Sequence, residues 1–375
     1  MFQFKDVVGQ EAAKQRLRLE VQEGRIAHAM LFCGPAGSGK LALALAYAHY
    51  VCCPHRSAED ACGECPTCAK WNKLAHPDLH FLFPVVKNSK KKKELCDDFL
   101  PEWRNLLLET PYFGLNRWQK ELGAENGQPI IYARESDELL RKLSLKSMEG
   151  GYKVVIIWLP EKLHEVCANK LLKLLEEPPS QTLFLLVSEA PERILPTILS
   201  RTQRFDVPRI EERDMALFLR QQCGLTEVDS ANIAHLANGS LINALEAMKP
   251  DADTALFFEL FVSLMRLAWQ RKIREMKLWS EQVAALGRER QKYFLEYCQR
   301  MVRENFIYNF HCADMNYMTV GEENFSTRFA PYINERNVMG MMDELAQAQV
   351  HVEQNVNPRM IFFDFALKMI VLLKQ

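Results

Sequence analysis

The segment Gly34–Lys40, with the sequence GPAGSGK, carries the most specific chemical signal in the chain. Its spacing, G-x-x-x-x-G-K, is that of a loop whose backbone N–H groups and following helix N-terminus cradle phosphates. A strand predicted at Ala29–Cys33 precedes it and a helix predicted over Leu41 to Val51 follows it, which is the context that the motif requires. The sequence therefore predicts a phosphate-binding loop, in use for ATP or ADP or vestigial, formed by Gly34, Gly37, Gly39 and Lys40.

The groups that hydrolysis needs are missing from their usual places. The loop lysine is normally followed by a hydroxyl that binds Mg²⁺, and this chain has Leu41 there. A carboxylate normally follows a second strand, but the predicted strand Lys153–Trp158 ends in Trp158 and Leu159, and Glu161 comes three residues after Trp158. We therefore expect no ATP hydrolysis at this site and no enzymatic activity of the chain's own.

Four cysteines, spaced x8, x2 and x2, form a candidate metal site: Cys53, Cys62, Cys65 and Cys68. Two short gaps let neighbouring sulfurs close on one tetrahedral ion, and four thiolates leave no open position for water. The pattern predicts a structural Zn²⁺, with Cys52 or His55 as alternatives to Cys53 for the first ligand. An iron–sulfur cluster and buried, unligated cysteines are the other interpretations.

Arg201 follows the last predicted helix of the first half, in the sequence Ser200-Arg201-Thr202-Gln203. The simplest interpretation of an isolated Ser-Arg pair is a surface salt bridge. In an oligomer of phosphate-loop proteins, an arginine here could instead reach a neighbour's γ-phosphate and stabilise the charge that develops there.

The composition limits which classes of protein this chain can belong to. Its 375 residues are 48% hydrophobic and 25% charged, enough for two or three packed domains. The 47 basic and 48 acidic residues nearly cancel, so any DNA contact must be local. The N-terminus does not resemble a signal peptide, and the apolar run Met360 to Leu373 is interrupted by Asp364 and Lys368. We expect a soluble cytoplasmic protein with no membrane contact. We find no carboxylate constellation for two-metal polymerase or exonuclease chemistry.

The elements that must position these residues change character along the chain. Near-continuous apolar runs at Lys153–Trp158 and Thr182–Val187 predict further strands buried on both faces of a parallel sheet, with a helix over Ala168–Leu175 between them. Pro84 to Gln128 interrupts this rhythm with the lysines 90–93 and several aromatic residues before a strand-like Pro129–Ala133, so we interpret it as an insertion. A four-lysine run is most simply a solvated loop, although it could contact DNA or protein.

After Pro208 the sequence predicts helices only. A short unit is broken at Asn238-Gly239-Ser240, and a longer apolar-periodic region follows, including a helix between about Thr254 and Trp269. Helix packing within one domain and contacts with neighbouring subunits both explain the wide apolar coverage of this region.

Taken together, these residues resemble the bacterial clamp-loader subunits of the AAA+ class, most closely those of the delta-prime type in DNA polymerase III. The resemblance covers about the first 210 residues. The motifs that carry it are Val8-Gly9-Gln10, His28–Phe32, the phosphate loop, the four-cysteine module, His76-Pro77-Asp78, Asn169–Pro179 and Ser200–Gln203.

The resemblance implies an α/β P-loop AAA+ domain over 1–207, a small helical lid over 208–250 and an all-α collar over 251–375. The first domain would contain the zinc module at about 52–70 and the insertion at about 84–128. The resemblance further implies a pentameric ring with gamma/tau and delta subunits that loads the sliding clamp onto primer-template DNA, with this subunit as a non-hydrolysing stator. Arg201 matches the arginine that the family supplies in trans to a neighbouring ATPase subunit.

The chain departs from the family pattern at several places. Thr202 replaces the cysteine of the Ser-Arg-Cys motif, and Gly239–Asn243 lacks the sensor arginine of motor subunits. Leu41 and Trp158-Leu159 agree with a stator. Two rival functions remain: an active gamma/tau-like motor in which Glu161 or another carboxylate recruits magnesium, and a free-standing zinc-bearing DNA-binding protein.

Overall fold

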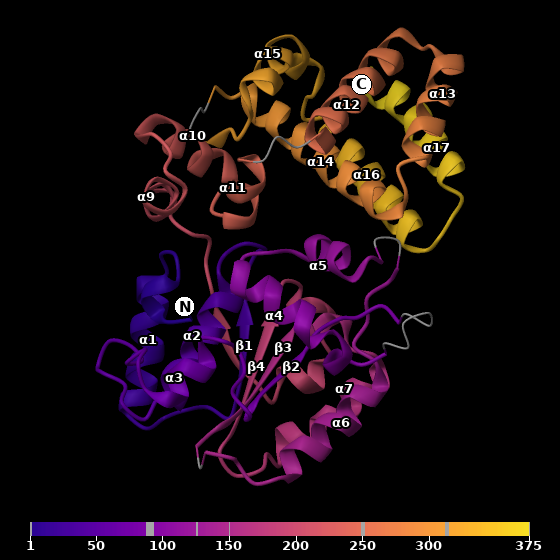
Figure 1. Cartoon of the computed structure of the whole chain (residues 1–375). Coiled ribbons are helices and arrows are strands. Elements are labelled where there is room, and N and C mark those ends of the chain that lie inside the picture. Colours follow the sequence, from indigo (N-terminus) through magenta and orange to yellow (C-terminus); the bar gives the residue numbers. More distant parts are fainter. Residues whose placement is uncertain are drawn as a thin grey trace. The chain divides into compact units, whose positions relative to one another are not determined.

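The computed structural model describes residues 2–87, 94–124, 127–149, 151–248, 252–311 and 315–374 (Figure 1). The chain divides into two compact units, Met1–Leu245 and Glu246–Gln375. The lysines 90–93, on which a DNA or protein contact was considered, lie outside the described residues.

A five-stranded parallel sheet forms the centre of the first unit, with the strand order β2-β3-β4-β1-β5. The strands are β1 (Ala29–Cys33), β2 (Leu79–Leu82), β3 (Lys153–Trp158), β4 (Thr182–Ser188) and β5 (Gln203–Asp206). Every residue of β1, β3 and β4 is buried, which is why these three appear in the sequence as near-continuous apolar runs. The predicted parallel sheet and its three central strands are confirmed.

The two outer strands were not predicted, and one predicted strand is wrong. β2 and β5 have four residues each, and β5 exposes three of them, so neither leaves an apolar run in the sequence. The segment Pro129–Ala133 makes only isolated bridges, from Ile130 to Val85 and from Ile131 to Leu163. Helix α6 already begins at Ala133, which ends the extended segment after two paired residues.

Eight helices accompany the sheet in the described part of the first 207 residues. They are α1 (Glu11–Gln22), α2 (Lys40–Cys52), α3 (Pro66–Trp71), α4 (Leu100–Glu109), α5 (Leu115–Leu122), α6 (Ala133–Ser144), α7 (Glu165–Glu176) and α8 (Pro196–Leu199). Figure 1 shows α1, α2 and α3 to one side of the strands and α6 and α7 to the other. The predicted helices at 41–51 and 168–175 correspond to α2 and α7.

Helix α2 lies against β1, β3 and β4 and is buried along its whole circumference from Lys40 to Val51. Small alanines alternate with leucines in this helix, so it can approach the sheet closely without voids. This packing fixes the N-terminus of α2, and with it the phosphate loop, at the carboxyl-terminal edge of β1.

The insertion over 84–128 packs into the sheet domain through its aromatic residues. Trp103 in α4 and Trp118 in α5 are both 0% exposed, and their ring centroids lie 5.1 Å apart. The Trp118 indole N–H donates to the Pro84 carbonyl over 2.7 Å. Trp103 also stacks on Phe83, just after β2, with ring centroids 4.3 Å apart. The described part of the insertion is therefore an integral layer of the domain.

Three short helices follow the sheet, and the first unit ends within the last of them: α9 (Glu212–Cys223), α10 (Glu227–Ala237) and α11 (Leu241–Ala247). They correspond to the predicted lid at 208–250. The Ile210 N–H donates to the Gly239 carbonyl over 3.0 Å, which ties the start of this region to its Asn-Gly-Ser turn. Residues 208–245 of the predicted lid belong to the same compact unit as the sheet, so its treatment as a separate domain stays a prediction.

The second unit is all-helical in its described residues and has a core of its own. Its main helices are α12 (Ala252–Gln270), α13 (Ile273–Ala284), α14 (Arg288–Tyr308), α15 (Val320–Phe329), α16 (Val338–Glu353) and α17 (Pro358–Leu372). Phe261, Phe294, Met341, Phe362 and Met369 lie at the centre of one continuous hydrophobic cluster, each 0% exposed. None of the helices in the described part of the chain is long and apolar enough to cross a membrane.

Candidate functional site

The phosphate loop has the predicted form, with a turn of glycines between β1 and α2. Gly37 and Gly39 have φ values of 77° and 88°, in the left-handed region that glycine adopts without steric cost. Gly39 is the N-cap of α2, so the positive end of the helix points into the loop. Lys40 is 4% exposed, and its Nζ donates to the Pro35 carbonyl over 2.5 Å. The lysine therefore lies back over its own loop.

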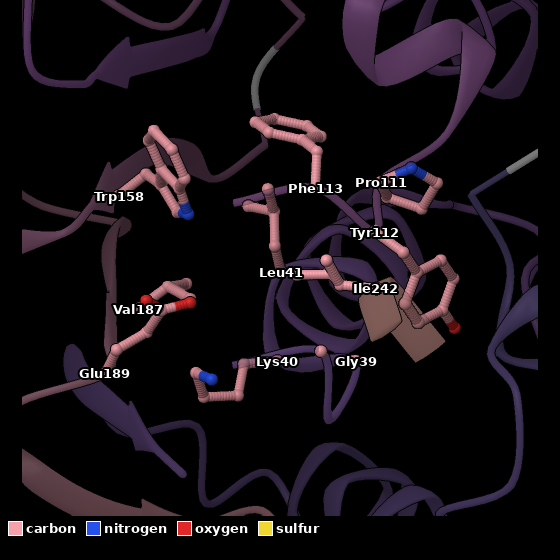
Figure 2. A pocket seen from close by; sticks show the side chains of 11 residues that line it. Gly39, Lys40, Leu41, Pro111, Tyr112, Phe113, Trp158, Val187, Glu189 and Ile242 are labelled. Atoms are coloured by element: carbon pink, nitrogen blue, oxygen red, sulfur yellow. The ribbon is translucent and has the colours of Figure 1, made fainter. Parts of the chain in front are cut away.

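One aliphatic and one aromatic side chain lie at the positions where hydrolytic sites carry oxygen ligands for Mg²⁺. Leu41 and Trp158 both line the pocket at the phosphate loop (Figure 2). Among the described residues that line it, Glu189 is the sole carboxylate. Burial raises the pKa of Glu189, against the opposing charge of Lys40, so its ionised form is disfavoured. Burial also lowers the pKa of Lys40.

Glu161, the alternative magnesium ligand, lies near enough for its charge to act on Lys40, but one of its oxygens is bonded to the turn after β4. Its Oε1 accepts the Glu189 N–H over 3.0 Å and the Ala190 N–H over 3.3 Å, which fixes the turn after β4. The η3 turn Pro160–Lys162 begins directly after β3 and carries Glu161 toward β4. Glu161 is not among the residues that line the pocket.

Several contributors to the pocket were missed by sequence reasoning. Tyr112 and Phe113 come from the insertion and Ile242 from the lid, more than 70 residues from the loop. The Leu241 N–H donates to the Gly37 carbonyl over 3.0 Å, and a Cβ built on Gly37 would overlap the Ser240 hydroxyl. Glu189, also missed, directly follows β4. Its position at the end of a buried strand is the one signal by which the sequence could have identified it.

The four predicted cysteines come together with the spacing of a tetrahedral metal site. The sulfurs of Cys53, Cys62, Cys65 and Cys68 all lie within 4.8 Å of one another. Three of the separations are 3.6 Å for Cys53–Cys62, 3.7 Å for Cys62–Cys68 and 3.5 Å for Cys53–Cys68. Four sulfurs about 2.3 Å from one ion in a tetrahedron would lie about 3.8 Å apart, so the cluster fits a metal ion.

Backbone N–H groups point at these sulfurs, as is expected where thiolates must be stabilised. The N–H groups of Cys62, Cys65 and Cys68 each approach the preceding cysteine's Sγ to 3.4 Å. Hydrogen bonds from the Glu64 and Cys65 N–H groups lower the pKa of Cys62 to about 6. The Cys52 thiol donates to the Tyr152 carbonyl at 3.8 Å, so the structure includes Cys53, and not Cys52, in the cluster.

The cysteine module is tied to the sheet domain by polar contacts. Asp60 accepts the N–H groups of Phe4 and Lys5 over 3.1 Å and 3.0 Å. Gln3 donates to the Ala61 carbonyl over 2.6 Å. On the other side of the module, Thr67 donates to Glu149 over 3.0 Å. The cluster therefore fastens a loop whose ends reach both the N-terminus and the segment after α6.

Arg201 lies in the turn between α8 and β5 and is partnered within the chain. Its Nε donates to Glu176 Oε1 over 2.7 Å, and its Nη1 donates to the Thr197 carbonyl over 2.9 Å and to Ser200 Oγ over 3.2 Å. The side chain remains 34% exposed. The surface ion pair considered from the sequence is thus present.

Arg201 and the phosphate loop of the same chain lie at opposite ends of the parallel strands. β5 begins at Gln203, which pairs with Met30, and the loop begins only after Cys33 at the end of β1. Because the strands are parallel, Met30 to Cys33 alone separates the two by about 10 Å. Arg201 therefore lies away from its own phosphate loop and is partly exposed at the amino-terminal end of the strands.

Comparison with known proteins assigns the chain to a family. The sequence profile described as "DNA polymerase III, delta subunit" matches residues 9–211, more than half of the chain. The chain belongs to this DNA polymerase III delta family. The parallel sheet with its phosphate loop, followed by a largely helical C-terminal region, is the P-loop AAA+ architecture expected for such a member.

Relatives of this delta-family chain carry two kinds of subunit name. It is 33% identical over 175 residues to the DNA polymerase III subunit delta' of Pseudomonas aeruginosa, covering 47% of this chain and 41% of that protein. It is 28% identical over 250 residues to subunit tau of Bacillus subtilis, covering 65% and 37%. The chain thus spans about two fifths of the length of these relatives. A solved gamma-subunit-related protein from Thermotoga maritima aligns with 96% of this chain and 99% of its own, at 13% identity and a TM-score of 0.40.

Proposed function

We propose that this delta-family chain is a delta-prime-like stator of the DNA polymerase III clamp loader. In this role it assembles with gamma/tau and delta subunits in a pentameric ring and helps to load the sliding clamp onto primer-template DNA. It hydrolyses no nucleotide itself and contacts DNA only as part of the complex. Its place of action is the cytoplasm.

The observation that carries the stator role is the lining of the phosphate-loop pocket. Leu41 and Trp158 occupy the two positions that would bring magnesium-binding oxygens to the site, and Glu161 is held by the turn after β4. Without oxygen ligands at these two positions, the loop lacks the usual means of holding the Mg²⁺ charge that phosphoryl transfer requires. Nucleotide that reached this loop would not be hydrolysed.

The position of Arg201 supports its action in trans. It lies at the end of the strands opposite its own phosphate loop, on the turn that leads into the exposed strand β5. Its side chain is about one-third exposed. An arginine there can meet the γ-phosphate held by an adjacent subunit and stabilise the charge of the transition state. Glu176 holds the side chain until that contact forms.

We propose Zn²⁺ as the metal of the cysteine cluster. Four thiolate ligands at tetrahedral separations suit zinc and leave no open position, so the ion would hold the module in shape and take no part in catalysis. The ion would supply only structural cross-linking.

The tau relative keeps a motor function as the second candidate. That match extends over 65% of this chain at 28% identity, and the match to the subunit delta' of Escherichia coli extends over the same share at 27%, so the extent of the matches does not separate the two kinds of subunit. Steady ATP turnover by the purified chain, lost in Lys40→Ala, would establish the motor and overturn the stator.

ATP turnover by the reconstituted clamp loader, with clamp and primed DNA, tests the role of Arg201. An arginine finger contributes about 10³–10⁵ in rate at its own site, so Arg201→Ala should lower turnover clearly even when other sites contribute to the total. Arg204→Ala is the matched control, since Arg204 is also exposed and ion-paired, to Asp206 over 2.8 Å. Gel filtration should show that both variants still assemble.

Two outcomes distinguish an in-trans role of Arg201 from a surface ion pair. Turnover that falls with Arg201→Ala and not with Arg204→Ala supports the in-trans role. Equal turnover in the three complexes would reduce Arg201 to a surface residue. The purified Arg201→Ala chain should lose less than about 1 kcal/mol of unfolding free energy, as expected for an exposed ion pair, which separates a rate effect from instability.

A further inference from the structure

The segment Pro111–Phe113, between α4 and α5, reaches the phosphate loop from the insertion. Tyr112 and Phe113 are 7% and 4% exposed, although they lie in a connection between helices. A Cβ added at Gly39 would lie 3.3 Å from Tyr112 Cε1, closer than an ordinary contact, so the phenol ring lies directly against Gly39 at the start of α2. Figure 2 shows Tyr112 and Phe113 around Leu41 and Gly39.

The tyrosine is held at this place by a specific hydrogen bond. The Val8 N–H donates to Tyr112 Oη over 2.9 Å, across 104 residues of sequence. Burial raises the pKa of the Tyr112 phenol, so the ring is neutral at physiological pH. A flat ring that accepts a hydrogen bond from a backbone N–H makes the same kind of contact as a nucleobase in a protein pocket.

Phe113 anchors the segment on the other side. Its ring centroid lies 5.3 Å from that of Trp158 and 5.4 Å from that of Trp103, within the aromatic cluster of the insertion. Trp158 is the residue at the end of β3 where hydrolytic members need a carboxylate. Trp158 therefore takes the place of a metal ligand and also provides the surface on which Pro111–Phe113 packs.

Two polar groups of the phosphate loop already have hydrogen-bond partners within the chain. Lys40 Nζ donates to the Pro35 carbonyl, and the Gly37 carbonyl accepts the Leu241 N–H from the lid. The segment, the lid and the loop thus form one set of contacts around the pocket. Phosphates on the loop would be accompanied by a sugar and a base that must leave the loop past the start of α2, where Tyr112 lies.

We infer that Pro111–Phe113 is a built-in occupant of the phosphate-loop pocket that excludes the sugar and base of nucleoside di- and triphosphates. This inference rests on the proposed function, in which the loop hydrolyses nothing, and adds that Tyr112 also prevents binding. The lid then stays docked on Gly37 whatever the nucleotide concentration. A stator with this device keeps one conformation of its first unit while its neighbours bind and release ATP.

Titration of the purified full chain with a fluorescent ADP analogue tests the inference. Wild type and Tyr112→Phe, which keeps the ring, should show no saturable binding up to about 1 mM, whereas Tyr112→Ala should bind at least about tenfold more tightly because the blocked fraction is removed. Wild type that binds as tightly as Tyr112→Ala would overturn the inference. A folded Tyr112→Ala chain, checked by circular dichroism, with no gain in affinity would also overturn it.

Hydrogen exchange provides a measurement that does not depend on the stability of Tyr112→Ala. Tyr112→Phe removes the acceptor of the Val8 N–H, so the Val8 amide should exchange at least about tenfold faster than in wild type. Equal exchange rates would show that the tyrosine does not occupy this place. Nucleotide binding by wild type leaves the Arg201 test untouched, and failure of the Arg201 test leaves nucleotide exclusion untouched, so the two proposals fail separately.

Discussion

At the end of β3, Trp158 packs among Trp103 and Phe113 at the position where a magnesium-dependent site needs a carboxylate. Leu41 adds a second apolar side chain to the same pocket. We therefore propose that Leu41 and Trp158, at the positions of the usual metal ligands, prevent hydrolysis at the phosphate loop. Neither change disturbs the fold, because both side chains are 5% exposed or less and fill space that the sheet domain can pack.

His80, in β2, gives the first unit a pH dependence. Burial, together with the charge of Lys142, lowers the pKa of His80 to about 4 from 6.5. The folded state therefore favours the neutral ring. The stabilisation is complete above pH 6.5 and is lost as the pH falls through that value toward 4, by up to about 3 kcal/mol.

Urea unfolding at pH 7 and pH 5 checks this expectation. His80→Asn should lose less unfolding free energy than wild type between the two pH values, because it has no ring to protonate in the unfolded state. His164, which lies on the surface as the N-cap of α7, offers the control variant His164→Asn. An identical pH dependence in wild type and His80→Asn would contradict the expectation.

At the scale of elements, the insertion connects the sheet to the pocket. Trp103 in α4 has 0% exposure and its ring contacts Phe83, Phe113, Trp118 and Trp158. Trp103→Ala should lower the unfolding free energy by about 3–5 kcal/mol, since it leaves a cavity that these rings cannot fill. Trp269→Ala, at a side chain that is 48% exposed, should cost clearly less. Chemical denaturation of both variants decides this, and equal losses would refute it.

The cysteine module is the second element whose contribution can be isolated. We expect one zinc per chain by mass spectrometry, and its loss in Cys68→Ser, because three thiolates no longer close the site. Cys52→Ser should retain the metal, since the Cys52 thiol donates to the Tyr152 carbonyl outside the cluster. Wild type without metal after purification under reducing, chelator-free conditions would favour the unligated interpretation.

At the scale of the whole molecule, the chain consists of two units with separate cores. The cysteine cluster and the phosphate loop both belong to the first unit, and the second is a helical bundle. We expect calorimetry to resolve two unfolding transitions, of which only one shifts to lower temperature on adding a zinc chelator. Residues 246–375 expressed alone should reproduce the other. A single transition that shifts as a whole would contradict independent units.

The sequence by itself determined the features that depend on local spacing. GPAGSGK between an apolar strand and an Ala/Leu-rich helix requires a loop at a helix N-terminus. Likewise, four cysteines within 16 residues are near enough in the sequence to come together in the fold. Strands β1, β3 and β4 were predictable because burial on both faces demands continuous apolar runs. The edge strands β2 and β5, and the false strand at Pro129–Ala133, show the limit of that signal where burial is one-sided or short.

Only the tertiary structure decided what lies around the loop. Nothing near Tyr112 in the sequence connects it with Gly39, because the contact depends on how the insertion packs through Trp103 and Trp118 against the sheet. The docking of Leu241 on Gly37 likewise joins residues about 200 positions apart. Sequence patterns report the periodicity and chemistry of neighbouring residues, whereas contacts between distant segments depend on the shape of the packed core. For this reason the loop could be predicted and its occupant could not.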